Sequence, residues 1–214
     1  MQAISSITVT TFGATGIRKI YDTIKLEQRI ENSNSPSTST GKNSGTRNGG
    51  KHKCKTEVLY GPLDSLDRST NVFAMVGPDV IGRPRSDFSG EPSWWYTKLP
   101  SVAGAPPWER GHLLASTLGG EGKKNWNNLA AMHRYTNRAF GNRGMRGFED
   151  SALKAIKLKK ECILVEIAPV FTLDENKNEK YYPDYIQIFA FGSKGYFYPT
   201  NGFSGKIINQ TNPS

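Results

Sequence analysis

The chain has 214 residues, of which 36% are hydrophobic and 22% charged, and this composition excludes wholesale disorder. A formal net charge of +9 favours polyanionic partners such as nucleic acid, an anionic membrane surface or an acidic protein. No run approaches the roughly 18 apolar residues of a membrane span. Because "MQAISSITVTTFG" also lacks the basic and then apolar layout of a signal peptide, we expect a soluble chain without a recognisable targeting segment.

The N-terminal quarter is predicted to lie outside the folded core. Within residues 1–30, "IRKIYDTI" places isoleucines at helical spacing, which predicts a short amphipathic helix. Residues 31–53 contain no aliphatic or aromatic side chain, so they bury too little apolar surface to offset their ordering entropy and predict a flexible polar linker. The folded domain is therefore expected to span residues 54–214.

The remaining segments predict an α+β fold. Strands are predicted in "TEVLYGPLD", "STNVFAMVG", "CILVEIAPVF", "YIQIFAFGS" and "GYFYPT", and a turn-rich excursion separates the second from the third. This excursion runs from Gly77 to Pro107. After it "ERGHLLA" and "NNLAAMH" are short apolar segments, and residues 150–160 place apolar side chains at helical spacing, with lysines towards the C-terminal end. This order lacks the regular alternation of strands and helices along the chain that a parallel sheet requires.

Cys54 and Cys162 are too few and too far apart for a zinc-ligand pattern, which normally shows close pairs. They are compatible with one disulfide or with two free thiols, and neither lies in the sequence context of a nucleophile.

Positive charge is concentrated in residues 123–160, which hold ten Lys or Arg but only two acids, Glu149 and Asp150. Directly before this segment, "WERGHLLASTLGG" contains His112, one of three histidines. A neutral imidazole suits the role of a base that deprotonates water for phosphodiester hydrolysis. His52, in the predicted linker, and His133, at the end of a predicted strand, are interpreted as structural.

The segments "ERGHLLASTLGG", "NNLAAMHRYTNRAF" and "GFED" resemble the DNA/RNA non-specific endonucleases of the ββα-metal, or His-Me finger, superfamily. They are most similar to the C-terminal nuclease domains of bacterial polymorphic toxins, and "YGPLDSLDRST" is similar to the start of such domains. The resemblance covers roughly residues 58–210. It implies a ββα-metal finger core packed on an antiparallel sheet.

The resemblance also implies roles for individual residues. His112 matches the general base that activates water, and Arg110 matches the motif arginine that contacts phosphate. Asn137 matches the asparagine that ligates the metal, and Asn128 matches an upstream asparagine with a structural or substrate-side role. Glu149 matches the acid that holds metal-bound water. The implied cofactor is Mg²⁺, for which Mn²⁺ or another divalent cation substitutes.

Further cations near these positions are predicted to bind the nucleic-acid backbone: Arg138, Arg143, Arg146, Lys123 and Lys124. One departure concerns Glu109, where the family usually has Asp. If this acid only braces the loop, one more methylene is tolerated. If it positions Arg110, activity falls.

Two other functions are compatible with the sequence: a non-catalytic nucleic-acid-binding module, and a metal-independent ribonuclease using His112 and Glu149.

The aromatic run in "EPSWWY" is interpreted as loop packing, with a platform for stacked bases as the alternative. By resemblance, the protein is expected to be secreted or delivered into a target cell as an antibacterial toxin or effector, with an acidic immunity protein as its partner.

Overall fold

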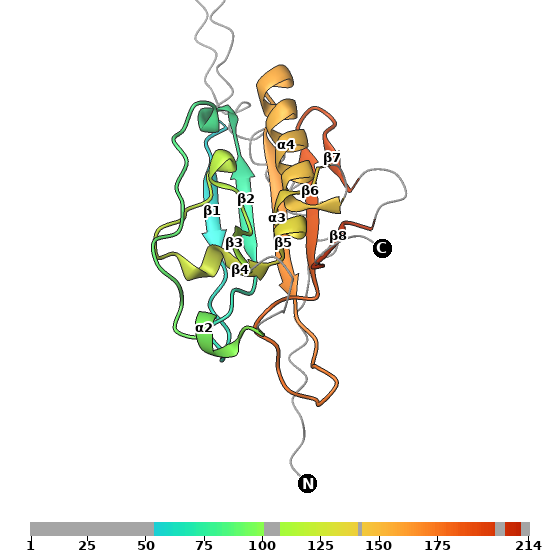
Figure 1. Cartoon of the computed structure of the whole chain (residues 1–214). Helices are drawn as coiled ribbons and strands as arrows, with labels where there is room; N and C mark the ends of the chain where they lie inside the picture. Colours follow the sequence, from blue (N-terminus) through green and yellow to red (C-terminus); the bar gives the residue numbers. More distant parts are fainter. Residues whose placement is uncertain (1–53, 101–107, 141–142, 200–203, 211–214) are drawn as a thin grey trace, which may run out of the picture. The chain divides into compact units, whose positions relative to one another are not determined.

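The structure is a computed structural model that describes residues 54–100, 108–140, 143–199 and 204–210 (Figure 1). The helix predicted within residues 1–30 and the linker predicted at 31–53 lie outside the described residues, so that part of the domain organisation stays a prediction. Within the part of the chain that is described, no helix is long and apolar enough to cross a membrane.

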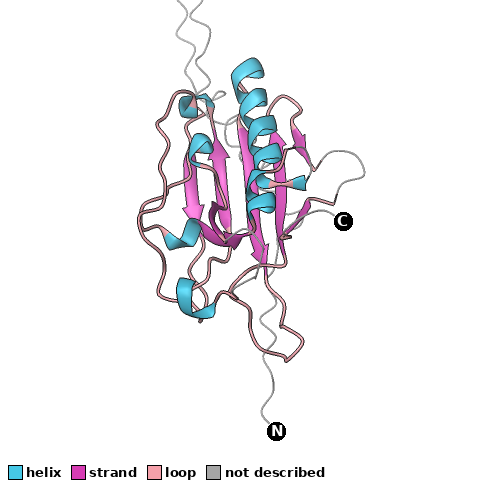
Figure 2. Ribbon diagram, in the orientation of Figure 1, coloured by secondary structure: helices cyan, strands magenta, loops and turns pink. Residues whose placement is uncertain are grey.

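One antiparallel sheet carries the fold, with strand order β1-β2-β5-β6-β7 and β8 paired to β6 (Figures 1 and 2). The strands are β1 Glu57–Tyr60, β2 Val72–Val76, β5 Ile163–Val170, β6 Tyr185–Gly192, β7 Phe197–Tyr198 and β8 Lys206–Ile208. Val72, Ala74 and Val76 are buried whereas the residues between them are less so, because alternate side chains point to opposite faces of a sheet. The five predicted strands are confirmed, and β8 was not predicted.

Helix α4, Met145–Lys159, lies over one face of the sheet (Figure 1). It packs its apolar stripe into the core that it shares with the sheet. The stripe consists of Met145, Phe148, Ala152 and Ile156, whose spacing of three or four residues places them on one helical face. The helix begins five residues before the start that the sequence predicted. Gly147, inside the first turn, disfavours helix intrinsically, so tertiary packing of Met145 and Phe148 decides the boundary.

A second, two-stranded sheet pairs β3, Glu109–His112, with β4, Leu129–Met132, and β4 leads into the short helix α3, Arg134–Arg138. This β3-β4-α3 unit is the predicted finger. Its two strands approach closely at Gly111, where an added Cβ atom would lie 2.4 Å from the Met132 sulfur. The remaining helices are α2 Trp95–Lys98 and the 3₁₀ turns η1 Pro78–Val80, η2 Ser116–Leu118 and η3 Trp126–Asn128.

The tryptophans of "EPSWWY" pack a loop onto the finger. Trp94 and Trp95 are buried and share an apolar cluster with Phe88 and Leu129. Their burial favours the packing interpretation over a base-stacking platform.

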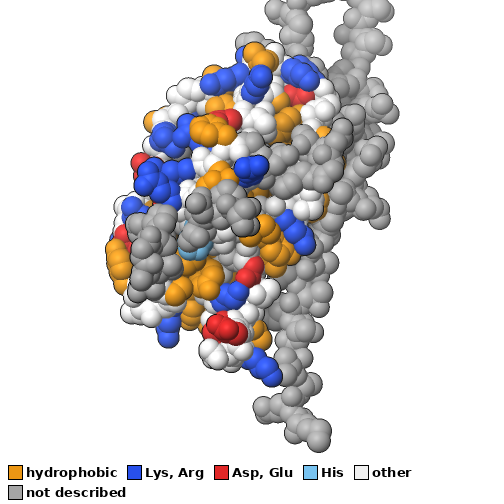
Figure 3. Space-filling model, turned by 45° about the vertical axis from the view of Figure 1, so that its right-hand side comes forward, with side chains coloured by type: hydrophobic (Ala, Val, Ile, Leu, Met, Phe, Trp, Pro, Cys, Tyr) orange, Lys and Arg blue, Asp and Glu red, His pale blue; other side chains and the backbone are white. Residues whose placement is uncertain are grey.

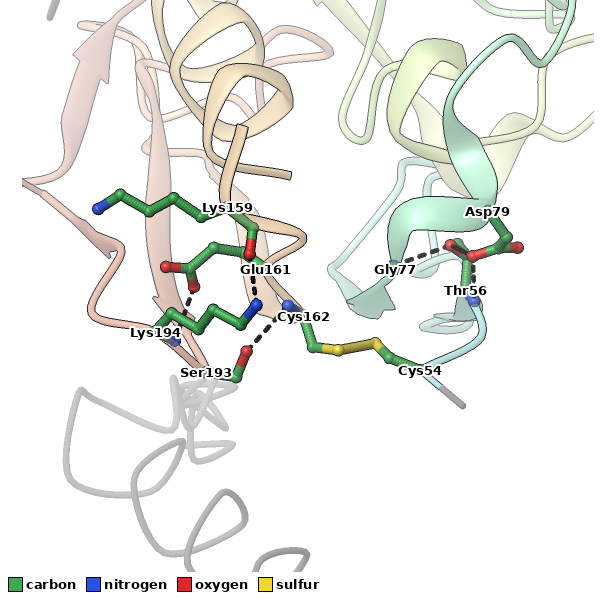
Figure 4. The surroundings of a disulfide bond; sticks show 9 residues. All are labelled: Cys54, Thr56, Gly77, Asp79, Lys159, Glu161, Cys162, Ser193 and Lys194. Atoms are coloured by element: carbon green, nitrogen blue, oxygen red, sulfur yellow. Dashed lines mark hydrogen bonds between the residues drawn. A yellow bond between two sulfur atoms is a disulfide. The ribbon is translucent and has the colours of Figure 1, made fainter. Parts of the chain in front are cut away.

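The two cysteines form a disulfide, which the sequence had left open (Figure 4). The bond links Cys54, just before β1, to Cys162, just before β5, across 108 residues of sequence. Hydrogen bonds fix the chain on both sides of it: Asp79 accepts from the Thr56 backbone N–H, and Ser193 accepts from the Cys162 backbone N–H. The cross-link therefore ties the edge strand β1 to the centre of the sheet.

Breaking this disulfide is expected to lower the free energy of unfolding by about 2–5 kcal/mol, because the unfolded chain regains the entropy of a long loop. The Cys54→Ala/Cys162→Ala variant should then melt below wild type by roughly 2–4 °C for each kcal/mol lost. Reductant should lower the wild-type Tm to that of the variant and leave the variant unchanged. A wild-type Tm that ignores reductant would contradict the prediction.

Candidate functional site

A pocket of about 880 Å³ is lined by residues from the finger, from the turn-rich loop before it and from α4. The finger contributes Glu109, Arg110, His112, Asn137 and Arg138; the loop contributes Arg85, Asp87, Phe88, Glu91, Trp95 and Tyr96; and α4 contributes Arg146, Glu149, Asp150 and Leu153. Side chains up to 68 residues apart in sequence, from Arg85 to Leu153, therefore share one pocket.

The contacts of His112, at the end of β3, fix one tautomer of its imidazole ring. Its Nε2 lies 2.9 Å from the Ser86 carbonyl oxygen, and its ring stacks on Phe88 with ring centroids 4.3 Å apart. A carbonyl oxygen only accepts hydrogen bonds, so Nε2 carries the proton and Nδ1 keeps its lone pair. Burial lowers the pKa of His112 below its ordinary value, although Asp87 nearby acts in the opposite direction. The imidazole is therefore neutral near pH 7, as a general base requires.

Glu109 binds two finger residues rather than Arg110. Its Oε2 accepts a 2.9 Å hydrogen bond from the Asn137 side-chain amide, and its carboxylate pairs with Arg138 through both Nε and Nη2. Because the Asn137 Nδ2 is engaged, Oδ1 is left as the free oxygen of that amide. These contacts brace α3 rather than position Arg110, and they support the hypothesis that the acid orients Asn137.

Truncating Glu109 is therefore expected to release Asn137. The Glu109→Ala variant should lose about 10–100-fold in metal affinity or activity, as is typical when an outer-shell partner of a metal ligand is removed. The matched control is Arg138→Ala, which deletes the other partner of the same carboxylate. If both variants show equal losses in metal affinity, measured by calorimetry, Glu109 acts through Arg138 and the orienting role is wrong.

Arg110 is anchored by the turn-rich loop. Its Nη1 donates to the Gly90 carbonyl at 2.9 Å and lies 3.3 Å from a Glu91 carboxylate oxygen. A guanidinium has five N–H donors, so this anchoring leaves others to bind a phosphate. About 37% of the side chain is exposed at the pocket.

Glu149, on α4, has the most strongly shifted carboxyl group of the pocket. Desolvation by burial raises its pKa to about 7; the neighbouring Asp150 adds to the increase, and Arg85 and Arg146 oppose it. A cation placed beside this carboxyl group would stabilise its ionised form and so lower its pKa again.

The donor atoms of the pocket suit a hard cation. Asn137 Oδ1 and the Glu149 carboxylate are oxygen donors, which Mg²⁺ prefers, and few protein ligands suffice because Mg²⁺ keeps several waters. Among the described residues, no group of three or more His, Cys, Asp and Glu side chains is arranged to hold a metal. The described residues therefore contain no closed structural zinc site of His, Cys, Asp and Glu ligands.

Asn128 was expected to have either a structural or a substrate-side role. Its side chain is fully buried, and Oδ1 accepts from the Leu114 N–H while Nδ2 donates to the Leu114 and Glu121 carbonyls. Every polar atom of the amide is therefore used to brace the loop between β3 and β4. Of the two roles expected, the structural one matches this geometry, and no atom is left for substrate.

The predicted backbone-binding cations divide into two groups. Arg138 and Arg146 line the pocket, whereas Arg143, Lys123 and Lys124 are exposed outside its lining. The Lys123 backbone instead pairs with the loop that carries Asp87, which supports that wall of the pocket. Nucleic-acid contact by these five residues stays a prediction.

The sequence interpretation missed the part of the pocket that comes from the turn-rich loop. Arg85 is close enough to influence the pKa of both His112 and Glu149, and Tyr96 is 79% exposed at the pocket. "GRPRSDFSG" gave no periodic signal, and only its position in a long loop, where functional residues concentrate, pointed to a site.

Comparison with known proteins identifies the family of the chain and solved structures with a similar fold. A model of the DNA/RNA non-specific endonuclease family matches residues 48–188. The crystal structure of NucA from Streptococcus agalactiae with no metal bound is similar at a TM-score of 0.52 and 20% identity, covering 74% of this chain and 72% of that one. The structure of Sda1 nuclease with bound zinc ion is similar at a TM-score of 0.50 and 20% identity, covering 72% and 80%. No curated protein matches. The two structures establish a shared α+β fold.

Proposed function

Because the chain belongs to the DNA/RNA non-specific endonuclease family, we propose that it is a divalent-metal-dependent endonuclease that hydrolyses DNA, and RNA as well, to leave 5′-phosphate ends. The observation that carries this proposal is the pocket in which a neutral His112, Asn137, Glu149 and several arginines lie together. The resemblance of the finger to ββα-metal nucleases assigns the same residues.

In the proposed reaction, Nδ1 of His112 takes a proton from water, and the water oxygen attacks phosphorus in line. The bond from phosphorus to the 3′ oxygen breaks and the leaving oxygen takes a proton from solvent, so the products carry a 5′-phosphate and a 3′-hydroxyl. The Ser86 carbonyl keeps the Nε2 proton in place and thereby fixes the tautomer. Asp87 stabilises the imidazolium that forms, since its charge favours protonation of His112.

Asn137 would hold the metal ion directly, and Glu149 would hold it through bound water. When bound, Mg²⁺ supplies electrostatic stabilisation of the charge that develops on the phosphoryl and leaving oxygens. Glu109 fixes the Asn137 amide so that Oδ1 stays available. The zinc ion named for Sda1 nuclease supports a divalent cation in this fold.

The arginines of the pocket would hold the substrate by its backbone. Arg85, Arg110, Arg138 and Arg146 present guanidinium groups that match phosphate oxygens. Phosphate contacts carry no sequence information directly, so this chemistry predicts cleavage that tolerates any sequence and weakens with salt.

We also propose that the protein acts outside the cell that makes it. The disulfide supports this, because disulfides persist in oxidising environments and are rare in the cytosol. An antibacterial toxin role, with an acidic immunity protein as partner, is supported by the sequence resemblance alone.

The test is to incubate long duplex DNA and single-stranded RNA with the protein in Mg²⁺ or in EDTA, and to analyse the product ends. Internal cleavage in Mg²⁺ alone, with 5′-phosphate ends, is the expected result. Cleavage of RNA that survives EDTA would indicate the metal-independent ribonuclease instead. Binding of either substrate without cleavage would indicate the nucleic-acid-binding module.

A further inference from the structure

We propose that the outer face of α4 is a binding track for the nucleic-acid backbone that continues from the pocket. This inference rests on the proposed nuclease function and extends it. The occupant is the part of the substrate that lies beyond the scissile phosphate, held by lysines that the sequence analysis did not include among the nucleic-acid-binding residues.

The track follows from helical spacing. Arg146, Asp150, Lys154 and Lys157 are four, four and three residues apart, so they lie along one face of α4. This face is opposite to the buried stripe that starts at Met145. From Arg146 to Lys157 the helix rises about 16 Å, which is about the axial rise of five nucleotides in one strand of duplex DNA.

The track is continuous with the pocket. Arg146 and Asp150 belong to the face just described and also line the pocket, and Leu153 is the last pocket residue along the helix. Lys154 is next to Leu153, and Lys157 lies one turn beyond it. A strand that leaves the pocket along α4 therefore meets these lysines first.

The charges along this face are available for phosphates. Lys154 and Lys157 are exposed, and among the described residues neither forms an ion pair with a carboxylate. The one acid of the face, Asp150, is paired with Arg146 at 3.8 Å. Lys159, Lys160 and Lys194 add exposed positive charge at the far end of α4, where the Lys194 ammonium donates to the Lys159 carbonyl. Figure 3 shows Lys and Arg side chains gathered over the upper part of the face in view.

Helix stability does not account for the whole track. Cations in the last turn interact favourably with the helix dipole, which explains Lys157 and Lys159 without any ligand. The effect fades within one turn, so it does not explain Lys154. Binding of a polyanion explains Lys154 and Lys157 together.

The test is the salt dependence of DNA binding, measured by fluorescence anisotropy with a labelled 30-base-pair duplex. A His112→Ala background, measured in EDTA, suppresses cleavage during the measurement. Adding Lys154→Gln and Lys157→Gln should reduce the magnitude of the slope of log K against log salt by about 1.8, or about 0.9 for each lost phosphate contact. The matched control is Lys55→Gln with Lys177→Gln, two exposed lysines outside α4 and the pocket, which should leave the slope unchanged.

Cleavage by the otherwise wild-type protein gives a second readout. The Lys154→Gln/Lys157→Gln variant should show a raised KM for long duplex DNA and an unchanged kcat, because neither lysine lies at the scissile bond. An unchanged salt slope, or an equal change in the control pair, would overturn the track. A wild-type protein that binds DNA with this slope but never cleaves it would instead contradict the proposed nuclease function.

Discussion

Replacing His112 with alanine is expected to lower kcat for DNA cleavage by about 10²–10⁴-fold, because the variant lacks the base that takes the proton from water. The His112 ring stacks on Phe88 and is hydrogen-bonded to the Ser86 carbonyl oxygen, so its loss could destabilise the fold. A melting curve must therefore show that the variant remains folded. His52→Ala is the matched control, since His52 lies in the predicted linker. A His112→Ala protein with wild-type kcat would rule out the base assignment.

His112 is also expected to set the pH dependence of kcat. Burial lowers the pKa of His112 below 6.5, so the active neutral form predominates above pH 6.5 and is lost as pH falls through the shifted pKa. At saturating Mg²⁺, kcat should therefore be constant at neutral and higher pH and fall by about tenfold per pH unit on the acid side. An acid limb centred above pH 6.5 would show that another group controls the rate.

Replacing Asn137 with alanine is expected to weaken the metal site by at least roughly 100-fold, beyond the 10–100-fold loss typical of outer-shell changes. The variant should need far more Mg²⁺ for half-maximal cleavage, and calorimetry should show the matching loss of affinity. Asn125→Ala is the matched control, because Asn125 is outside the pocket lining. Equal Mg²⁺ requirements for wild type and Asn137→Ala would exclude Asn137 as a ligand.

Metal binding should also depend on pH through Glu149. The free protein holds this carboxyl with a pKa of about 7, so below pH 7 a bound cation must displace a proton. Metal affinity should therefore be constant above about pH 7 and fall by up to about tenfold per pH unit below it. The Glu149→Gln variant should bind metal more weakly at high pH and show no such dependence.

The sequence predicted the finger well because its residues lie in one short unit. His112 ends β3 and Asn137 lies in α3, which follows β4 directly, so their relative positions depend mostly on local pairing. Glu149 lies on α4, one residue before the start of the helix that the apolar spacing predicted. Their roles in catalysis stay predictions.

Features that depend on tertiary contacts could not be predicted in this way. The sequence does not show which way an asparagine side chain points, and Asn128 proved to be a buried brace. Arg85 reaches the pocket from a loop without periodicity, and Glu109 reaches Asn137 across the fold of the finger. The pairing of Cys54 with Cys162 required the relative positions of β1 and β5.

The central claim is that the Nδ1 base of His112 and a divalent cation act together in one pocket, and rescue of His112→Ala by free imidazole tests it most directly. Plasmid cleavage by the variant should recover as neutral imidazole is added in Mg²⁺, and EDTA should abolish the recovered activity. Recovered cleavage that persists in EDTA would contradict the claim. So would cleavage by His112→Ala at the wild-type rate when no imidazole is added.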